Sequence, residues 1–503
     1  MFLVTVNETK WEYDVHALVQ SFFPGEEVWV QTPDTSLAKR ESISWERGLA
    51  VTVLPMGARL QFLQNENLGS KEFFTPYRVF LWQPAKADFV LGWDKEFKNG
   101  FKRFLYRSLA KATGRILPWG NLTGIRPTKI AMGMFLAGEK EEQVMRFLQE
   151  EHYVSPKKAA LCVEIAEREQ EILSRIHAKE GYSLYIGIPF CPTTCLYCSF
   201  TSNPLAKWKG KVETYLDCLI GEIRFVQKEC KGRILDSVYI GGGTPTTLTA
   251  EQLDRLLGTL RECLDLSTVQ EFCVEAGRAD SITEEKLLIL KKHGVGRISI
   301  NPQTMKEETL KLIGRQATAM QVKEAFKLAR SIGDFNINMD LILGLPGEGS
   351  EDVRRTMDEI LALRPDSLTV HSLAIKRASK LAQRIRESGM QTFINTEETM
   401  ELAAKTAAAM DMHPYYLYRQ KNMAGNFENV GYATEGNYGI YNILIMEEVQ
   451  TIVALGAGSI TKVVYPDGRI ERCENVKEVA QYIDRIDEMT DRKKALLYSL
   501  DKG

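Results

Sequence analysis

The pattern of apolar and polar positions divides the chain near residue 180. Beyond this point, short apolar runs recur, separated by segments long enough for a helix. Strands that alternate with helices predict crossover connections and a parallel sheet. Periodicity alone does not separate a TIM-like barrel from an open doubly wound sheet. The six predicted strands are Tyr182–Ile188, Asp236–Ile240, Glu271–Glu275, Arg297–Asn301, Asn336–Leu343 and Asp366–His371.

The first 180 residues follow two other patterns. Short alternating runs between Pro, Gly and Asn turns predict a small β-rich region over residues 1–90, and amphipathic spacing predicts a helical region over residues 91–180. The alternating strands and helices fill residues 181–375, and residues 376–503 follow as a separate C-terminal region. The predicted N-terminal strands lie at Phe2–Val6, Glu27–Val30, Gly48–Leu54 and Ala58–Leu63.

Composition and charge describe an ordinary globular chain. The 503 residues are 44% apolar and 26% charged, with a net charge of −2, which argues against generic nucleic-acid binding. The N-terminus lacks a basic leader before an apolar run, and no segment approaches the ~18 apolar residues that cross a bilayer. We therefore expect a cytoplasmic protein without a membrane or nucleic-acid partner.

Three cysteines lie close together directly after the first predicted barrel strand. The segment CPTTCLYC holds Cys191, Cys195 and Cys198. This spacing favours an iron–sulfur cluster, whose irons are usually held by four cysteine thiolates. With three thiolates, one iron keeps an open position for another ligand. A closed zinc site needs a fourth protein ligand and a disulfide is uncommon in a cytosolic chain, but zinc and redox thiols stay open at this point.

Polar and glycine-rich residues follow the other predicted strands. The second strand leads into Gly241–Pro245, the third ends at Glu275, the fourth leads into Asn301–Gln303, the fifth carries Asp340 and the sixth reaches His371. Ligands of parallel α/β folds bind at the carboxyl ends of the strands, so we expect these residues to converge on one face. Glycines would let a ligand reach backbone amides, and the carboxylates suit ribose hydroxyls or an amino group.

These motifs resemble those of a known family. The CxxxCxxC spacing, with Tyr197 at the aromatic position, and the GGGTP turn are similar to those of radical S-adenosylmethionine (SAM) enzymes. Over residues 180–465 the pattern LYIGIPFC, YIGGGTPT, VEAG, GRQ, NMDLILGLPGE and GAGSITK resembles the oxygen-independent coproporphyrinogen III oxidase family, most closely its HemZ-type coproporphyrinogen dehydrogenase branch. The resemblance implies an α/β fold: a partial (β/α)6 TIM-like barrel with an N-terminal α+β region and a small C-terminal extension. It also implies that residues 181–375 are the radical SAM barrel core and that residues 376–503 cover the substrate.

The resemblance also implies the cofactors. The three cysteines would hold a 4Fe–4S cluster whose unique iron chelates the amino and carboxylate groups of SAM. One or two SAM molecules would bind, and no residue is assigned as catalytic because the radical is generated at the cluster-bound SAM. The positions that match SAM contacts of the family are Tyr185, Tyr197, Gly243, Thr244, Pro245, Glu275, Gln303, Arg315, Asp340 and Ala374.

The implied reaction belongs to haem biosynthesis. It converts two propionates of coproporphyrinogen III into the vinyl groups of protoporphyrinogen IX by 5′-deoxyadenosyl radical chemistry, with electrons from a reducing donor protein. A substrate with carboxylates calls for cations, preferably arginine. The candidates are Lys376, Arg377, Arg419 and Lys421, of which Arg419, set among tyrosines, is favoured.

Two departures from the family bear on the tetrapyrrole substrate. A histidine before the first cysteine is replaced by Gly187, and the family's N-terminal strap is replaced by the unrelated residues 1–180. One alternative is a haem chaperone of the same superfamily, whose HNxxYW motif here reads ENVGYA at Glu428–Ala433, without the histidine and the tryptophan. Another is a different radical SAM reaction on a tetrapyrrole.

Overall fold

The computed structural model divides into two compact units. It describes residues 1–24, 26–36, 39, 44–54, 57–68, 71–82, 95–198, 202–376, 379–388, 395–420, 423 and 427–500. The N-terminal unit comprises Met1–Val163 and Arg419–Glu428, and the barrel unit comprises Glu164–Tyr418 and Asn429–Gly503. Among the helices of the described residues, none combines the length and apolarity needed to cross a bilayer.

The N-terminal unit is built on a five-stranded sheet with the order β2-β1-β3-β4-β5. Helix α1 was not predicted, although Val15, Leu18, Val19 and Phe22 are buried at helical spacing and pack with α3 in one core. The four predicted strands are confirmed: β1 has the predicted bounds, β2 is shifted by one residue, and β3 and β4 are longer than predicted. The elements are β1 (Phe2–Val6), α1 (Glu12–Phe22), β2 (Val28–Gln31), β3 (Arg47–Leu54), β4 (Gly57–Leu68), β5 (Lys71–Trp82), α3 (Lys95–Thr113), α4 (Thr128–Leu136), α5 (Glu141–His152) and α6 (Pro156–Leu173), which runs into the barrel unit.

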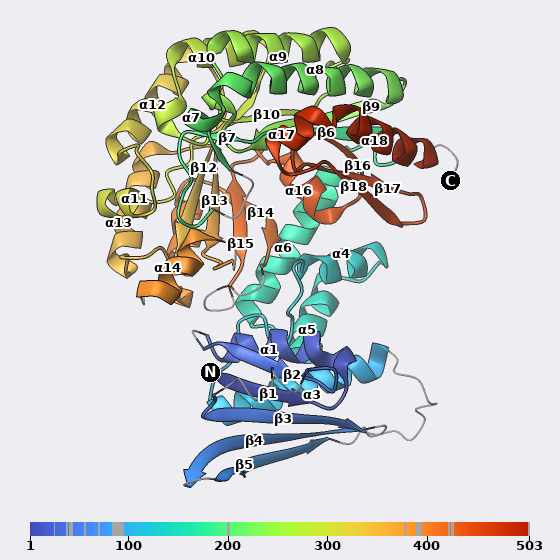
Figure 1. Ribbon diagram of the computed structural model, residues 1–503, viewed down its shortest axis with the longest axis vertical. Helices are drawn as coiled ribbons and strands as arrows, with labels where there is room; N and C mark the ends of the chain where they lie inside the picture. Colours follow the sequence, from blue (N-terminus) through green and yellow to red (C-terminus); the bar gives the residue numbers. More distant parts are fainter. Residues whose placement is uncertain are drawn as a thin grey trace. The chain divides into compact units, whose positions relative to one another are not determined.

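The barrel unit confirms the six predicted parallel strands and their helical connections. The strands follow one another in sequence order across the sheet, so right-handed crossovers place their helices on one face. Figure 1 shows α8 to α13 as an outer arc around these strands. This order fits the partial barrel, since a doubly wound sheet reverses its strand order. The strands are β6 (Gly181–Ile188), β9 (Ile234–Gly242), β10 (Glu271–Glu275), β11 (Arg297–Ser299), β12 (Asn336–Leu343) and β13 (Ser367–Ser372).

Strands from the C-terminal part of the chain extend the same sheet at both edges. Strand β16 pairs in parallel with β6 and is followed by antiparallel β17 and β18, while β15 and β14 add antiparallel strands beyond β13. These strands were not predicted. The two pairings that attach them to the barrel strands, β16 with β6 and β15 with β13, join segments that are distant in sequence. Their bounds are β14 (His413–Tyr418), β15 (Asn429–Ala433), β16 (Thr451–Leu455), β17 (Ile460–Val464) and β18 (Ile470–Glu474), with a small pair, β7 (Phe190–Cys191) and β8 (Asn203–Pro204), in the cysteine loop.

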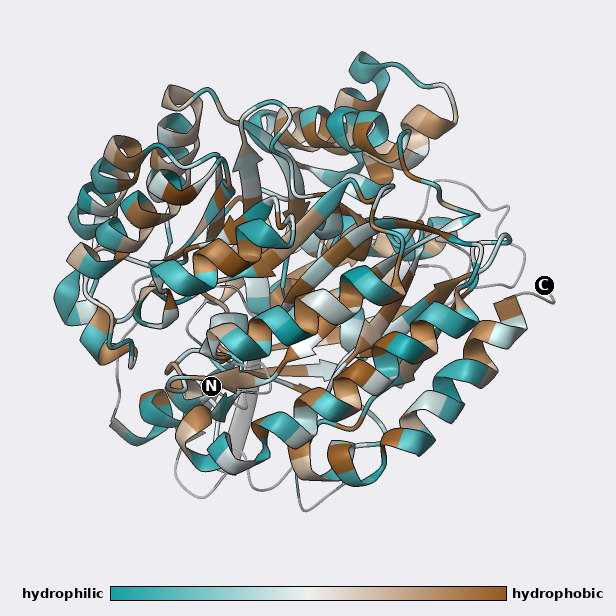
Figure 2. Ribbon diagram, turned by 90° about the horizontal axis from the view of Figure 1, so that it is seen from above, coloured by the Kyte–Doolittle hydropathy of each residue, from teal (hydrophilic) through white to brown (hydrophobic). Residues whose placement is uncertain are grey.

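The helices of the barrel unit are amphipathic. On α9, Leu253, Leu256, Leu257 and Leu260 are buried at helical spacing, and Thr249 caps the helix by accepting a hydrogen bond from the amide three residues on. Figure 2 shows the same two-sided pattern of polar and apolar residues on the helices around the strands. The helices are α7 (Leu205–Trp208), α8 (Val212–Glu229), α9 (Ala250–Cys263), α10 (Glu284–Lys292), α11 (Glu307–Leu312), α12 (Ala319–Ile332), α13 (Ser350–Leu363), α14 (Lys380–Ser388), α15 (Glu397–Ala409), α16 (Ile440–Glu447), α17 (Val479–Asp484) and α18 (Ile486–Leu500).

Helix α16 packs on the sheet below the candidate site. The carboxylate of Glu271 on β10 accepts hydrogen bonds of 2.8 and 3.1 Å from the amides of Ile440 and Tyr441. Alternate residues of a strand share a face, so Glu271 and Glu275 lie on the same side of β10. The helix therefore occupies the amino-terminal part of this face, and Glu275 stands at its carboxyl end.

Candidate active site at the carboxyl edge of the sheet

The cysteine loop follows the end of β6. Cys191 and Cys195 are each only 9% exposed, and Cys198 is half-buried. The amide of Leu196 donates a hydrogen bond of 2.9 Å to the carbonyl of Ile313, which ties the loop to the residues after α11. The structure thus holds three thiols on one loop at the carboxyl edge of the sheet.

Two side chains direct hydrogen-bond donors at the cysteine sulfurs. The Thr244 hydroxyl lies 3.6 Å from Cys191 Sγ, and Arg278 Nη1 lies 4.0 Å from Cys195 Sγ. Asp280 orients the Arg278 guanidinium through hydrogen bonds of 2.9 and 2.6 Å. Such donors stabilise thiolates and tune the potential of a cluster. Sequence reasoning missed Arg278, although it directly follows the VEAG motif.

This donor set fits an iron–sulfur cluster. Three thiols come from one loop, and neighbouring groups donate to two of the sulfurs. Among the residues that the structure describes, no three His, Cys, Asp or Glu side chains converge closely enough to hold a single metal ion. A cluster spreads its cysteine ligands over several irons, so its thiolates need not meet at one point.

The glycine turn packs tightly against the cysteine loop. The amide of Gly243 donates a hydrogen bond of 2.7 Å to the carbonyl of Ile188, and a Cβ atom on Gly243 would lie 2.5 Å from the carbonyl oxygen of Phe190. The expectation that a ligand reaches this amide is wrong, because the amide is already bonded within the protein. The glycine is required for close approach of two backbones. A SAM contact through another atom of Gly243 stays a prediction.

Glu275 ends β10 beside stacked tyrosines. The Tyr239 hydroxyl donates a hydrogen bond to Glu275 Oε1. The ring of Tyr185 lies 6.2 Å from that of Tyr239, and Tyr441 from α16 stacks on Tyr239 with centroids 4.4 Å apart. Burial raises the pKa of Glu275 from 4.5 to about 7, and the hydrogen bond from Tyr239 opposes the rise. Sequence reasoning missed two of these tyrosines: Tyr239, which donates to the carboxyl group, and Tyr441, which stacks on Tyr239.

Asp340 lies two strands away from Glu275, on β12. Asn338 donates a hydrogen bond of 2.7 Å to Asp340 Oδ1, and His371 Nε2 lies 3.9 Å from Oδ2. Burial by itself raises the pKa of Asp340, but His371 and Asn338 together bring it below its ordinary value. At neutral pH, Asp340 is therefore ionised. Glu275, with its pKa of about 7, is present in both its protonated and its ionised form.

Three buried polar atoms at this edge lack a hydrogen-bond partner among the described residues: Ser299 Oγ, Gln303 Oε1 and Arg315 Nε. Gln303 also has a φ of 70°, which is uncommon for a residue with a side chain. The other nitrogens of Arg315 donate to the carbonyl of Asn301 and, at 3.2 Å, to the hydroxyl of Tyr197. Buried polar groups are rarely left unpaired, so these atoms mark a place that suits a polar ligand. Ser299 was not predicted.

The remaining predicted site residues lie nearby or outside the described residues. Pro245 is buried directly after the glycine turn, and Ala374 is half-buried just beyond β13. Their contacts with SAM stay predictions. Lys376 is exposed, whereas Arg377 and Lys421 lie outside the described residues.

Arg419 belongs to the N-terminal unit and is 5% exposed. Its guanidinium donates to the carbonyl of Leu122 and lies 5.8 Å from the ring centre of Trp119. Trp119 donates a hydrogen bond of 2.7 Å to Glu428, which also pairs with Lys158. Burial lowers the pKa of Arg419, and Glu428 opposes the change. Arg419 is thus part of a buried polar cluster, and its contact with a substrate stays a prediction.

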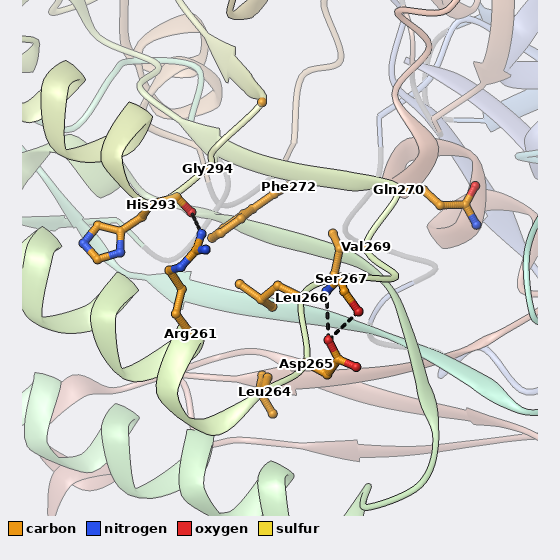
Figure 3. Close-up of a pocket in the computed structure, with 11 residues that line it drawn as sticks. Arg261, Leu264, Asp265, Leu266, Ser267, Val269, Gln270, Phe272, His293 and Gly294 are labelled. Atoms are coloured by element: carbon orange, nitrogen blue, oxygen red, sulfur yellow. Dashed lines mark hydrogen bonds between the residues drawn. The ribbon is translucent and has the colours of Figure 1, made fainter.

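A separate pocket of about 660 Å³ lies at the opposite end of the strands. Gln270 and Phe272 line it at the start of β10, and Arg261 donates a hydrogen bond of 2.7 Å to the carbonyl of His293 at its wall (Figure 3). None of the predicted site residues lines this pocket.

Comparisons with known proteins identify the family of this chain. Residues 185–360 match the family model of the radical SAM superfamily. The chain is 42% identical over 405 residues to the "Oxygen-independent coproporphyrinogen-III oxidase-like protein HemZ" of Bacillus subtilis (strain 168). The aligned residues cover 79% of this chain and 81% of that protein. The chain belongs to the HemZ family of radical SAM proteins. The family expected from the motifs is confirmed, and it implies a 4Fe–4S cluster and SAM as cofactors.

Two further proteins are similar to this HemZ-family chain. The "Heme chaperone HemW" of Bacillus subtilis (strain 168) is 33% identical over 243 residues, which is 48% of this chain and 63% of that protein. The solved structure of "Coproporphyrinogen III oxidase (HemN) from Escherichia coli" has a TM-score of 0.49 and 23% identity, and the match covers 64% of this chain and 72% of that one.

Proposed function

We propose that this protein converts coproporphyrinogen III to protoporphyrinogen IX by oxygen-independent oxidative decarboxylation. In this proposal Cys191, Cys195 and Cys198 hold the 4Fe–4S cluster, and one or two SAM molecules bind at the carboxyl edge. The observation that carries the proposal is the gathering of three thiols, two carboxylates and three unpaired polar atoms at that edge. The similarity to a coproporphyrinogen-III oxidase-like protein, at 42% identity, supports a tetrapyrrole as the substrate.

The chemistry sets what the protein must supply. Each propionate side chain loses carbon dioxide, one hydrogen atom and one electron as it becomes a vinyl group. When bound, the cluster and SAM supply the one-electron chemistry that removes hydrogen from an unactivated carbon. A reducing protein is the electron donor, and a one-electron acceptor takes the electron that is released with the carbon dioxide.

The residues at the edge take distinct parts in this proposal. Thr244 and Arg278 stabilise thiolate charge at two of the cysteines, and the ionised carboxylate of Asp340 binds a hydroxyl or amino group of SAM. Gln303 and Arg315 offer buried polar atoms to the same ligand. The substrate carboxylates are assigned to cations, and the candidates from the sequence are Lys376, Arg377, Arg419 and Lys421, with Arg419 favoured.

A haem chaperone is the second candidate, favoured by the HemW relative. In that branch a histidine stands at the position of Glu428. Here Glu428 is 1% exposed and is bonded to Trp119 and Lys158. The side chain at this position is therefore bonded to other residues of the protein, which disfavours haem ligation there.

An anaerobic assay tests the proposal. Reconstituted protein with a reductant, SAM and coproporphyrinogen III should release vinyl-containing product, and Cys195→Ala should lose both the product and the ~4 irons of the cluster. A matched control is Cys218→Ala, because Cys218 lies on α8 outside the loop. Cleavage of SAM without vinyl product would indicate another tetrapyrrole reaction. Tight haem binding without SAM cleavage would indicate the chaperone.

A further inference from the structure

His371 lies between two polar groups at the carboxyl end of β13. Its Nε2 atom is 3.9 Å from Asp340 Oδ2, and its Nδ1 atom is 3.3 Å from the Tyr418 hydroxyl. The three residues come from β13, β12 and β14. The sixth strand was expected to reach the ligand face, but no role was assigned to this histidine.

The imidazole has a polar neighbour at each ring nitrogen. Nδ1 and the Tyr418 hydroxyl are close enough for a hydrogen bond in which either group can donate. When the hydroxyl is the donor, the proton of the neutral ring is on Nε2, directed at the carboxylate of Asp340. A separation of 3.9 Å is too long for a direct hydrogen bond, so the pair interacts electrostatically.

The two carboxylates of the site differ in their neighbours. Glu275, at the end of β10, and Asp340, within β12, are both partly buried and repel each other. Glu275 accepts a hydrogen bond from the Tyr239 hydroxyl, and burial raises its pKa to about 7. Asp340 faces His371, and its pKa is lowered. Carboxyl groups whose environments separate their pKa values take different roles.

We propose that His371 is a positioning residue that keeps the Asp340 carboxylate ionised and oriented, so that the site presents one fixed anion to a hydroxyl or ammonium group of its ligand. Glu275 then supplies the carboxyl group that gains and loses a proton. This inference rests on the proposed function, in which Asp340 binds SAM. It adds His371 as the residue that keeps the Asp340 carboxylate ready for this contact. Tyr418 supports the arrangement by holding the imidazole from its other side.

Infrared spectroscopy of the full-length reconstituted protein without SAM tests the inference directly. A protonated carboxylic acid has a carbonyl band that a carboxylate lacks, and the band is assigned to Asp340 when Asp340→Asn removes it. The pH at which the Asp340 band appears measures the pKa of this carboxyl group. The band should appear at a lower pH in the native protein than in His371→Phe, because the variant lacks the facing imidazole. Appearance of the band at the same pH in both proteins overturns the proposal.

Further variants separate positioning from a general loss of structure. His371→Gln keeps an N–H group near the position of Nε2 and should return the pH at which the Asp340 band appears toward the native value. His413→Phe, which changes a half-exposed histidine on β14, should leave the spectrum unchanged. SAM affinity, measured by equilibrium dialysis, should fall about tenfold in His371→Phe, as expected for a weakened charge-assisted hydrogen bond. Because the infrared result needs no turnover, a protein that shows the predicted bands but forms no vinyl product keeps this inference and refutes the proposed function.

Discussion

Replacing Glu275 by glutamine tests whether the carboxyl group at the end of β10 exchanges a proton near neutral pH. Burial raises the pKa of Glu275 from 4.5 to about 7. The hydrogen bond from Tyr239 lowers this pKa, and the negative charge of Asp340 raises it. Glutamine keeps the size of the side chain and an oxygen that accepts the Tyr239 hydrogen bond. It removes only the charge that appears at high pH.

The expected magnitude follows from linkage between protonation and folding. The folded protein binds the Glu275 proton more tightly than the unfolded chain, so this stabilisation is complete below pH 4.5 and is lost as the pH rises through about 7. A pKa difference of about 2.5 corresponds to about 3 kcal/mol. The variant Glu275→Gln should therefore match the native protein near pH 4.5 and exceed its stability by up to about 3 kcal/mol at pH 8.5.

Urea unfolding of the two proteins in parallel at the two pH values measures this difference. The exposed substitution Glu262→Gln on α9 serves as the control and should show no pH-dependent difference. A stability difference between Glu275→Gln and the native protein that is the same at both pH values would refute the reasoning, because it would show that Glu275 has an ordinary pKa.

Three other substitutions test single contacts in the barrel unit. Gly243→Ala should lower cluster content several-fold in iron analysis, because its Cβ atom would collide with the backbone of the cysteine loop. Lys493→Met should cost ~3–5 kcal/mol in urea unfolding, because it leaves the buried carboxylate of Glu222 without its cation, whereas the exposed Lys494→Met should cost little. Thr244→Val removes a donor from the first cysteine and should lower the cluster's reduction potential in a spectroelectrochemical titration, with iron content retained.

Strand and motif positions were accessible from sequence because they depend on local patterns. The β10 and β12 strands were predicted with the bounds that the structure shows, since buried parallel strands are continuous apolar runs between polar turns. The spacing of Cys191, Cys195 and Cys198 is likewise a property of one short segment. Parallel strands share the direction of their ends, so the order of strands also predicted the edge at which the polar residues gather.

Contacts between elements that are distant in sequence could not be predicted from local patterns. Strand β16 joins the sheet beside β6 although about 260 residues separate them. Helix α1 has a regular apolar stripe, but it is short and stands between strands, so its pattern was read as part of a β-rich region. The packing of Gly243 against the cysteine loop required the positions of two backbones, which no local pattern contains.

The sequence by itself determined the chemistry of the chain: three thiols on one loop, a barrel of alternating strands and helices, and carboxylates at the strand ends. Only the tertiary structure decided the state of those groups. Glu275 and Asp340 look equivalent in sequence, yet one faces Tyr239 and the other His371. Protonation depends on burial and on charges within a few ångströms, and these distances are set by how β9, β10, β12 and β13 lie beside one another in the sheet.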